Sequence, residues 1–449
     1  MRSYPAFHGK IELRNGEKMR YRTDPVTGNK LSALGFGCMR FPRGLNIDME
    51  KTEKLIMEAI AKGVNYFDTA YIYPGNEAAL GGILHKNDVR GKVFVATKLP
   101  FFKCGKYEDF DRIFNEQLDN LKTGYIDYYL MHNMSGLHDW QPLAEIGIEK
   151  WIAEKKARGQ IRSIGFSFHG PLHGFIDVID AYGWDFCQIQ YNYMNETYQA
   201  GRAGLLKAHA KGLPVIVMEP LLGGKLAAGL PKKAEMLFKE ADPELSPAAW
   251  ALKWLFSQPE VTVVLSGMND PVQLADNINT AEKFAGSIGA ADKLADGAMT
   301  AGAMPDGAVT AGTLSAGEAS TGGALTAGDA EVIGKVRAII KEAYKVPCTG
   351  CNYCMPCPHH VNIPGCFNTY NSSYANGYMT GILLYLNDTH AFRRKGATRA
   401  INCVKCGLCE KKCPQHIKIP DELVKVKKRM EPFWFAMPMN IFRRMFDAK

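Results

Sequence analysis

The feature that most constrains this chain is the crowding of its cysteines toward one end. Twelve cysteines occur among 449 residues, and nine of them lie between Cys348 and Cys413. Eight of the nine form two regularly spaced runs: Cys348, Cys351, Cys354 and Cys357, then Cys403, Cys406, Cys409 and Cys413. A proline follows the last cysteine of each run. Nothing in the sequence indicates secretion, so this asymmetry favours a metal module in a reduced, cytoplasmic compartment over a set of disulfides.

The spacing within the runs predicts two [4Fe–4S] clusters with crossed ligands. Two intervening residues let consecutive thiolates face one cubane, and the cysteine before proline typically binds the other cluster of a pair. One set would be Cys348, Cys351, Cys354 and Cys413, and the other Cys403, Cys406, Cys409 and Cys357. The second run has the bacterial ferredoxin spacing, whereas the first is one residue shorter before Cys357. Four-cysteine zinc sites are the alternative. Cys366 fits neither set, and we expect a buried thiol.

Upstream of the cysteines, strand-like and helical patterns alternate. Helical patterns are clearest at 49–61, 110–121, 142–157 and 247–256, with Pro142 and Pro247 where a first helical turn tolerates proline. Eight strand–helix units in about 250 residues predict a (β/α)8 TIM barrel. A doubly wound sheet is the rival, but we find no Gly-x-Gly-x-x-Gly turn near the start. The eight strand-like runs occupy 32–38, 64–68, 93–98, 126–132, 162–167, 187–191, 214–219 and 262–266.

The composition changes along the chain and predicts its domains. No run of 18 or more apolar residues occurs, so no transmembrane segment is expected. The net charge of +8 is a mild excess with no nucleic-acid-binding module, so no nucleic-acid partner is expected. We expect the aromatic tail to pack on the barrel, with peripheral membrane contact as the alternative. The predicted segments are an extension (1–18), the barrel (19–284), a low-complexity Ala/Gly/Thr insertion without function of its own (285–330), a small α-helical dicluster domain (331–430) and an aromatic, basic tail (431–449).

Polar residues cluster at the ends of the predicted strands, where barrel active sites form. Among them, Asp68, Tyr73, Lys98 and His132 make an acid–base constellation. Reducing a carbonyl requires a proton donor for its oxygen, and tyrosine is normally too weak an acid at neutral pH. The Lys98 ammonium is expected to lower the pKa of Tyr73, with Asp68 holding Lys98 and His132 orienting the carbonyl. Taken singly, each of the four also fits an ordinary core or surface position.

Three motifs carry a family resemblance. They are Phe67-Asp68-Thr69-Ala70-x2-Tyr73-x3-Glu77, Thr97-Lys98 and Asp127-Tyr128-Tyr129-Leu130-x-His132. In order and spacing they resemble the catalytic tetrad of the aldo-keto reductase family. With the cysteine runs, the chain resembles the subfamily that carries a C-terminal ferredoxin-type dicluster domain. The resemblance implies that Tyr73 is the general acid, that Asp68 and Lys98 tune it, and that His132 positions the substrate.

The resemblance also implies a nicotinamide cofactor, with Ser167 and Gln190 holding its carboxamide. The family often has Asn where Phe168 stands, and an aromatic residue near Met218. No basic residue is placed for a 2′-phosphate, so NADH is favoured over NADPH. A barrel phosphate site could also hold FMN, although no flavin motif supports it. Further expected cofactor contacts are Glu219, Leu221, Gly223, Lys225, Gly267, Asn269, Gln273 and Asn277.

These features together predict an iron–sulfur oxidoreductase of aldo-keto reductase type. It would reduce a carbonyl or related small molecule with nicotinamide or cluster-derived electrons. Nicotinamide passes two electrons as hydride whereas a cubane passes one, so direct coupling between them is awkward. One alternative is an electron-transfer protein whose barrel docks a partner. Another is that the clusters are structural or sense oxygen. The basic region after Arg393 would suit an acidic redox partner protein.

Overall fold

The computed structural model describes residues 19–286 and 325–431, apart from 376, 390 and 392–395. Eight parallel strands close into a barrel in the order β10-β3-β4-β5-β6-β7-β8-β9. Each strand overlaps the run predicted for it, so the TIM-barrel prediction is confirmed. The strands are β3 (Leu34–Gly37), β4 (Tyr66–Asp68), β5 (Phe94–Leu99), β6 (Ile126–Met134), β7 (Ile161–Phe168), β8 (Phe186–Gln190), β9 (Val215–Met218) and β10 (Val261–Ser266).

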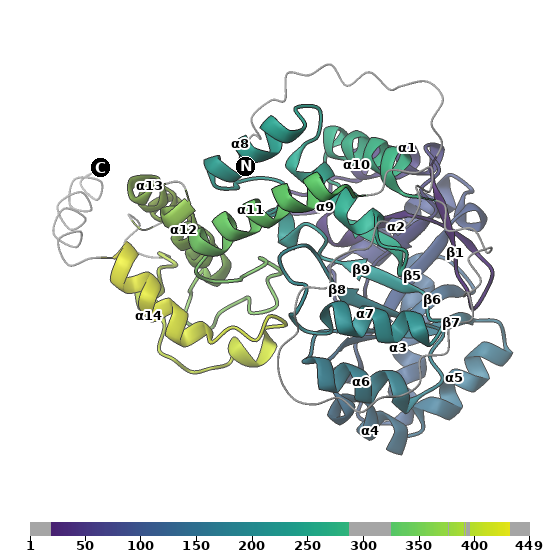
Figure 1. Ribbon diagram of the computed structural model, residues 1–449. Helices are drawn as coiled ribbons and strands as arrows, with labels where there is room; N and C mark the ends of the chain where they lie inside the picture. Colours follow the sequence, from purple (N-terminus) through teal and green to yellow (C-terminus); the bar gives the residue numbers. More distant parts are fainter. Residues whose placement is uncertain (1–18, 287–324, 376, 390, 392–395, 432–449) are drawn as a thin grey trace, which may run out of the picture.

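Helices surround the barrel (Figure 1). The helix predicted at 142–157 is two helices, because Gly147 adopts a left-handed backbone with φ of 92° and ends the first one. Pro142 therefore lies inside a helix and not in a first turn, whereas Pro247 begins its helix behind a Ser246 cap. The helices are α1 (Met49–Ala61), α2 (Asn76–Lys86), α3 (Tyr107–Leu121), α4 (Leu137–Glu145), α5 (Ile148–Ala157), α6 (Leu172–Ala181), α7 (Gly201–Ala210), α8 (Lys232–Ala241), α9 (Pro247–Phe256) and α10 (Pro271–Phe284).

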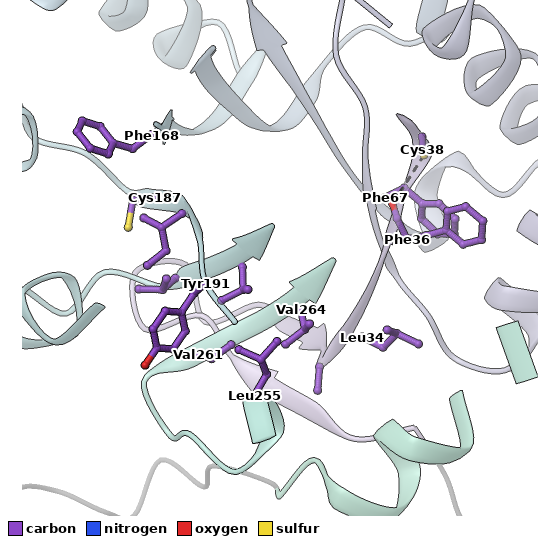
Figure 2. Packing of buried hydrophobic residues seen from close by; sticks show 14 of the residues in the cluster. Leu34, Phe36, Cys38, Phe67, Phe168, Cys187, Tyr191, Leu255, Val261 and Val264 are labelled. Carbon is purple, nitrogen blue, oxygen red and sulfur yellow. Dashed lines mark hydrogen bonds between the residues drawn. The ribbon is translucent and has the colours of Figure 1, made fainter. Parts of the chain in front are cut away.

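The barrel buries two apolar layers, because successive residues of a strand face opposite sides. The outer layer packs against the helices, and Figure 2 shows Phe36, Phe67 and Val264 within it. The inner layer is tightly filled: a Cβ on Gly35 would lie 2.7 Å from the Leu265 side chain, so a larger residue there would force its neighbours to move. The inner layer consists of Leu31, Tyr66, Ala96, Tyr128, Leu130, Phe186, Ile216, Val263 and Leu265.

A short hairpin closes the barrel at the N-terminal ends of its strands. Its strands are β1 (Tyr21–Thr23) and β2 (Lys30–Ser32), which pair antiparallel. The buried Arg22 guanidinium donates hydrogen bonds to backbone carbonyls of Phe256 at 2.5 Å and Gln258 at 3.1 Å, just before β10. A site for substrate is therefore left to the opposite end of the barrel.

Within the described residues beyond the barrel there are four further helices: α11 (Ala327–Ala343), α12 (Ile363–Ala375), α13 (Tyr378–Asp388) and α14 (Ile419–Met430). The last three pack on an apolar cluster of their own, and loops carry the cysteine runs beside it. We call residues 346–431 the cysteine module. Helix α11, which the sequence boundaries assign to the dicluster domain, instead packs on the barrel, because its Ile333, Val336 and Ile340 join the barrel's apolar cluster. Asp329 in α11 also pairs with Lys253 at 2.8 Å.

Three sequence predictions fall outside the described residues. They concern the extension at 1–18, most of the insertion at 285–330 and the tail from 432 onward. Among the helices that the structure describes, none is long and apolar enough to cross a bilayer.

Candidate active site and cluster sites

The four residues of the predicted tetrad lie together at the C-terminal end of the barrel. Asp68 ends β4, Lys98 and His132 lie in β5 and β6, and Tyr73 follows β4 in a loop. The buried Lys98 ammonium donates to Asp68 Oδ1 at 2.6 Å and to the Thr69 carbonyl at 2.7 Å. Its Nζ is 5.6 Å from the centroid of the Tyr73 ring. The Tyr73 and His132 rings meet edge to face with centroids 6.1 Å apart.

Burial sets the protonation of this site. Desolvation, with Tyr353 and Asp68 adding to it, holds the pKa of Tyr73 well above its usual 10. The lowering of the Tyr73 pKa expected from Lys98 is therefore not found, because burial of the phenol outweighs it. Burial also lowers the pKa of His132 well below its usual value, and the nearby Lys98 reinforces this. The site thus holds a neutral imidazole and a protonated phenol.

One residue that the sequence analysis did not select completes this group. Tyr353 lies between two cysteines of the first run, and its hydroxyl is 3.3 Å from Nε2 of His132. It is also a neighbour of Tyr73, whose pKa it raises. An oxygen atom of the cysteine module therefore sits beside both side chains that were expected to hold a substrate oxygen. The only sequence signal for Tyr353 is an aromatic residue between two ligand cysteines, which gives no direction toward the barrel.

Of the two residues expected to hold a nicotinamide carboxamide, Gln190 contacts the cysteine module. Gln190 ends β8 and accepts a hydrogen bond at Oε1 from Gln415 Nε2 at 2.8 Å. Gln415 follows Cys413 and Pro414, and sequence reasoning missed it as well. Within the described residues, Gln190 Nε2 and Gln415 Oε1 are buried without a partner. Ser167 Oγ accepts a hydrogen bond from the backbone N–H of Asn133 at 2.7 Å.

The loop after β9, with the expected contacts Glu219, Leu221, Gly223 and Lys225, lies against the first cysteine run. A Cβ on Gly223 would lie 1.9 Å from the Thr349 carbonyl oxygen, and φ there is +68°. Only glycine can occupy this position. Burial raises the pKa of Glu219 to about 7, although Arg40 and Thr349 oppose the rise. Burial lowers the pKa of Lys225.

The remaining expected contacts form the rim where β10 leads into α10. Gly267 and Asn269 are exposed. Gln273 Oε1 accepts a hydrogen bond from the Asn269 amide at 3.2 Å. The buried Asn277 side chain donates to Ser266 Oγ at 2.8 Å. These four residues are therefore neighbours, and their role as cofactor contacts stays a prediction.

Further hydrogen bonds fix the cysteine module over the barrel mouth. Tyr198 donates to the Gln415 carbonyl, and Gln199 donates to the Pro414 carbonyl at 2.7 Å. His416 donates from Nε2 to the His169 carbonyl at 2.7 Å. A groove of about 370 Å³ remains between the two parts, and its lining includes Arg40, Gly223, Lys225, Thr349, Asn352 and Asn368.

The eight cysteines of the two runs gather into two groups. Cys357 shares a pocket with Cys403, Cys406 and Cys409, and Val361, Ile363 and Leu423 give it apolar walls. The other group is joined electrostatically: burial raises the pKa of Cys351 to about 12, and Cys348 and Cys413 add to the rise. Cys348, Cys351 and Cys413 likewise raise the pKa of Cys354, and Cys409 of the other group adds a smaller effect. Each group therefore takes one cysteine from the other run, as in the crossed sets that the spacing predicts.

The donor chemistry of both groups fits a cubane. Four cysteines around an apolar-walled pocket are the ligand set of a [4Fe–4S] cluster. In a cubane each iron takes one cysteine, so the sulfurs surround a cluster and do not meet at one point. Among the described residues, no three His, Cys, Asp or Glu side chains converge on the position of a single metal ion. Cys366, which fits neither set, is buried at 0% exposure.

Comparisons with known proteins agree with these two parts. The aldo/keto reductase family matches residues 33–288, and the 4Fe-4S dicluster domain matches residues 347–417. Morphine 6-dehydrogenase of Pseudomonas putida is 29% identical over 263 residues, which are 56% of this chain and 83% of that protein. L-galactose dehydrogenase of Arabidopsis thaliana is 28% identical over 295 residues, 58% of this chain and 88% of that protein. The structure of an aldo-keto reductase from Bacillus halodurans, in its holo form, shares the fold with a TM-score of 0.50 at 23% identity, covering 59% of this chain and 91% of that one.

Proposed function

Because the chain belongs to the aldo/keto reductase family and carries a 4Fe-4S dicluster domain, we propose that it reduces the carbonyl group of a small molecule beside Tyr73 and His132, with electrons that arrive through its clusters. Its relatives are oxidoreductases, and the family match supports nicotinamide use as well. The preference for NADH over NADPH stays a prediction. The substrate class and the electron route are the new parts of this proposal.

One observation carries it. The Tyr353 hydroxyl lies 3.3 Å from His132 Nε2 and close to Tyr73. This pocket can therefore hold an oxygen atom by hydrogen bonds, as a carbonyl substrate requires. The same tyrosine lies between Cys351 and Cys354, so a substrate in its place would lie against the first cysteine group. A substrate oxygen would have to displace the Tyr353 hydroxyl, whose separation from His132 is long for a hydrogen bond to oxygen.

The barrel residues supply binding and protons. A neutral His132 can donate one N–H bond to the substrate oxygen and hold it in place. Tyr73 keeps its proton until negative charge develops on that oxygen, and the buried Lys98 ammonium next to it favours the transfer electrostatically. Reduction of a carbonyl to an alcohol takes two electrons and two protons. Tyr73 gives one proton to oxygen, and the other goes to carbon from water.

The two cysteine groups would hold the clusters. Cys348, Cys351, Cys354 and Cys413 form the group beside the tetrad, and Cys357, Cys403, Cys406 and Cys409 form the outer one. Clusters of this kind supply electrons one at a time. In the outer group Cys406 is exposed, and the exposed Lys405, Lys411 and Lys412 lie near it in the chain. This surface would suit an acidic one-electron carrier protein as the electron donor.

Anaerobic turnover with an artificial donor tests the proposal. Purified protein with both clusters is supplied with reduced methyl viologen and a panel of small aldehydes and ketones. We expect carbonyl-dependent viologen oxidation that Tyr73→Phe lowers by about 10²- to 10⁴-fold, because the ring stays but the proton donor is lost. Tyr71→Phe is the matched control, since the Tyr71 hydroxyl bonds Glu116 at 2.7 Å and not the tetrad. Equal turnover by wild type and Tyr73→Phe would reject the role of the tetrad.

A further inference from the structure

We propose that the cysteine module excludes nicotinamide cofactors from the barrel, because the Gln415 side chain occupies the position of the cofactor's carboxamide. The inference rests on the proposed function and deepens it: while the module is docked, the reaction runs on electrons from the clusters and not on hydride. Under this inference Gln190 and Gly223, which were expected to contact a cofactor, contact the cysteine module of the same chain.

The carboxamide end of the expected cofactor site shows a direct substitution. Nicotinamide carries a primary amide, and so does glutamine. Gln190, the residue expected to recognise that amide, accepts a hydrogen bond from Gln415 Nε2 at 2.8 Å. Gln190 is 1% exposed and Gln415 4% exposed, so no second amide can reach Gln190 unless Gln415 leaves. Gln190 thus still binds a primary amide, but this amide belongs to Gln415 of the protein and not to a cofactor.

At the phosphate end the cysteine module contacts the loop after β9, but a groove of about 370 Å³ lined by Arg40, Gly223 and Lys225 remains. The loop with Gly223 was expected to offer backbone N–H groups to the cofactor's phosphates. The Thr349 carbonyl oxygen instead lies 1.9 Å from where a Cβ on Gly223 would stand. A carbonyl oxygen carries partial negative charge and would repel a phosphate placed against it. The cysteine module therefore fills the carboxamide end of the expected site and contacts Gly223 at the phosphate end.

The Gln415 side chain is held firmly in this position. On the same short segment, the Pro414 carbonyl accepts from Gln199 at 2.7 Å, and His416 donates to the His169 carbonyl at 2.7 Å. The Gln415 carbonyl accepts from Tyr198. Displacing Gln415 would strain or break several buried hydrogen bonds, each of which is costly to leave unmade.

Cofactor binding tests the inference without any substrate. Full-length protein with both clusters is placed in anaerobic equilibrium dialysis against NADH and, separately, NADPH. We expect no saturable binding by the wild type up to about 1 mM. Gln415→Ala frees Gln190 Oε1 and should tighten binding at least about tenfold, the equivalent of one buried hydrogen bond to a competitor. His416→Ala is the matched control, because it loosens the same segment without touching Gln190. Iron content confirms that each variant is loaded.

Two results would overturn the inference. Micromolar binding of either NADH or NADPH by the wild type would show that the docked module does not exclude nicotinamide cofactors. Equal binding by the wild type and Gln415→Ala, or the same gain in His416→Ala, would show that Gln415 is not the excluding group. Dialysis measures cofactor binding, whereas the viologen assay measures turnover. If the protein did not reduce carbonyls, the exclusion of nicotinamide could still be correct. If it bound nicotinamide, carbonyl reduction with cluster electrons could still be correct.

Discussion

At the scale of single residues, Tyr353 has two effects that oppose each other. Its hydroxyl demonstrates that an oxygen fits beside Tyr73 and His132, yet it fills the place that a substrate oxygen needs. A substrate must therefore compete with a side chain of the protein. The competitor is tethered between Cys351 and Cys354, so it is always present at the same effective concentration.

Removing that hydroxyl should help substrate binding. In Tyr353→Phe the ring stays between the cysteines, but the contact to His132 is lost. We expect KM to fall by about 2- to 10-fold, the worth of one hydrogen bond, while kcat stays within about twofold. Steady-state viologen-coupled kinetics with one aldehyde provide the measurement, and Tyr71→Phe again serves as the control. A large fall in kcat would instead make Tyr353 a participant in the reaction.

At the scale of elements, helix α11 determines where the barrel can be cut. Ile333, Val336 and Ile340 lie in the barrel's apolar cluster, and Asp329 pairs with Lys253. A chain ending at Phe284 would expose the surface that these side chains cover. A chain ending at Tyr344 would keep it buried.

We therefore expect the longer barrel fragment to be soluble and to melt at a higher temperature than the shorter one. The loss of three buried aliphatic side chains is worth several kcal/mol, at about 1.5–3 kcal/mol each. Circular dichroism melts of both fragments make the comparison. If both fragments melt at the same temperature, α11 contributes nothing to the barrel.

The elements also show what could be predicted from sequence. Short apolar runs between helical patterns located all eight barrel strands, because a parallel strand that is buried on both faces is a nearly continuous apolar run in the sequence. The same reasoning placed Asp68, Lys98 and His132, since polar residues at adjacent strand ends must be neighbours. It joined α4 and α5 into one helix, because the left-handed turn at Gly147 has no signature beyond a single glycine.

The contacts of Tyr353 and Gln415 could not be predicted in this way. Both residues lie in loops whose local spacing concerns the cysteines alone. What aims them into the barrel is the docking of one part of the chain on another, across 221 residues for Tyr353 and His132 and 225 residues for Gln415 and Gln190. Local patterns carry no information about such distant surfaces. Phe168, which departs from the family pattern, is the one hint, since the carbonyl of the next residue, His169, accepts a hydrogen bond from His416 of the cysteine module.

At the scale of the whole molecule, the metal content tests the cysteine groups. We expect about eight iron and eight sulfide per chain, because each group of four cysteines fits one cubane. Anaerobic metal and sulfide analysis measures both. Cys413→Ser should disturb the group beside the tetrad although it lies in the second run, whereas Cys406→Ser should disturb the outer group. Stoichiometric zinc without sulfide would contradict the prediction.

The positive charge of the surface near Cys406 should affect the rate of reduction by protein electron donors only. Reversing Lys411 and Lys412 to Glu removes attraction for an acidic carrier, and we expect its association rate to fall about tenfold at low salt. Reduction by methyl viologen should not slow, because it is small and not acidic. Stopped-flow reduction with an acidic ferredoxin provides the measurement. Lys92→Glu, on an exposed turn before β5, is the control. An equal effect of both changes would exclude a specific entry surface.

The crossed grouping of the cysteines also affects how the molecule is made. Each group draws on both runs, so neither can be complete until the ribosome has passed the second run. The barrel's last strand, β10, ends at Ser266, far upstream, and its core can form while the cysteines are still being translated. The C-terminal end of the barrel in a nascent chain should therefore be uncovered until the cysteine module has been synthesised.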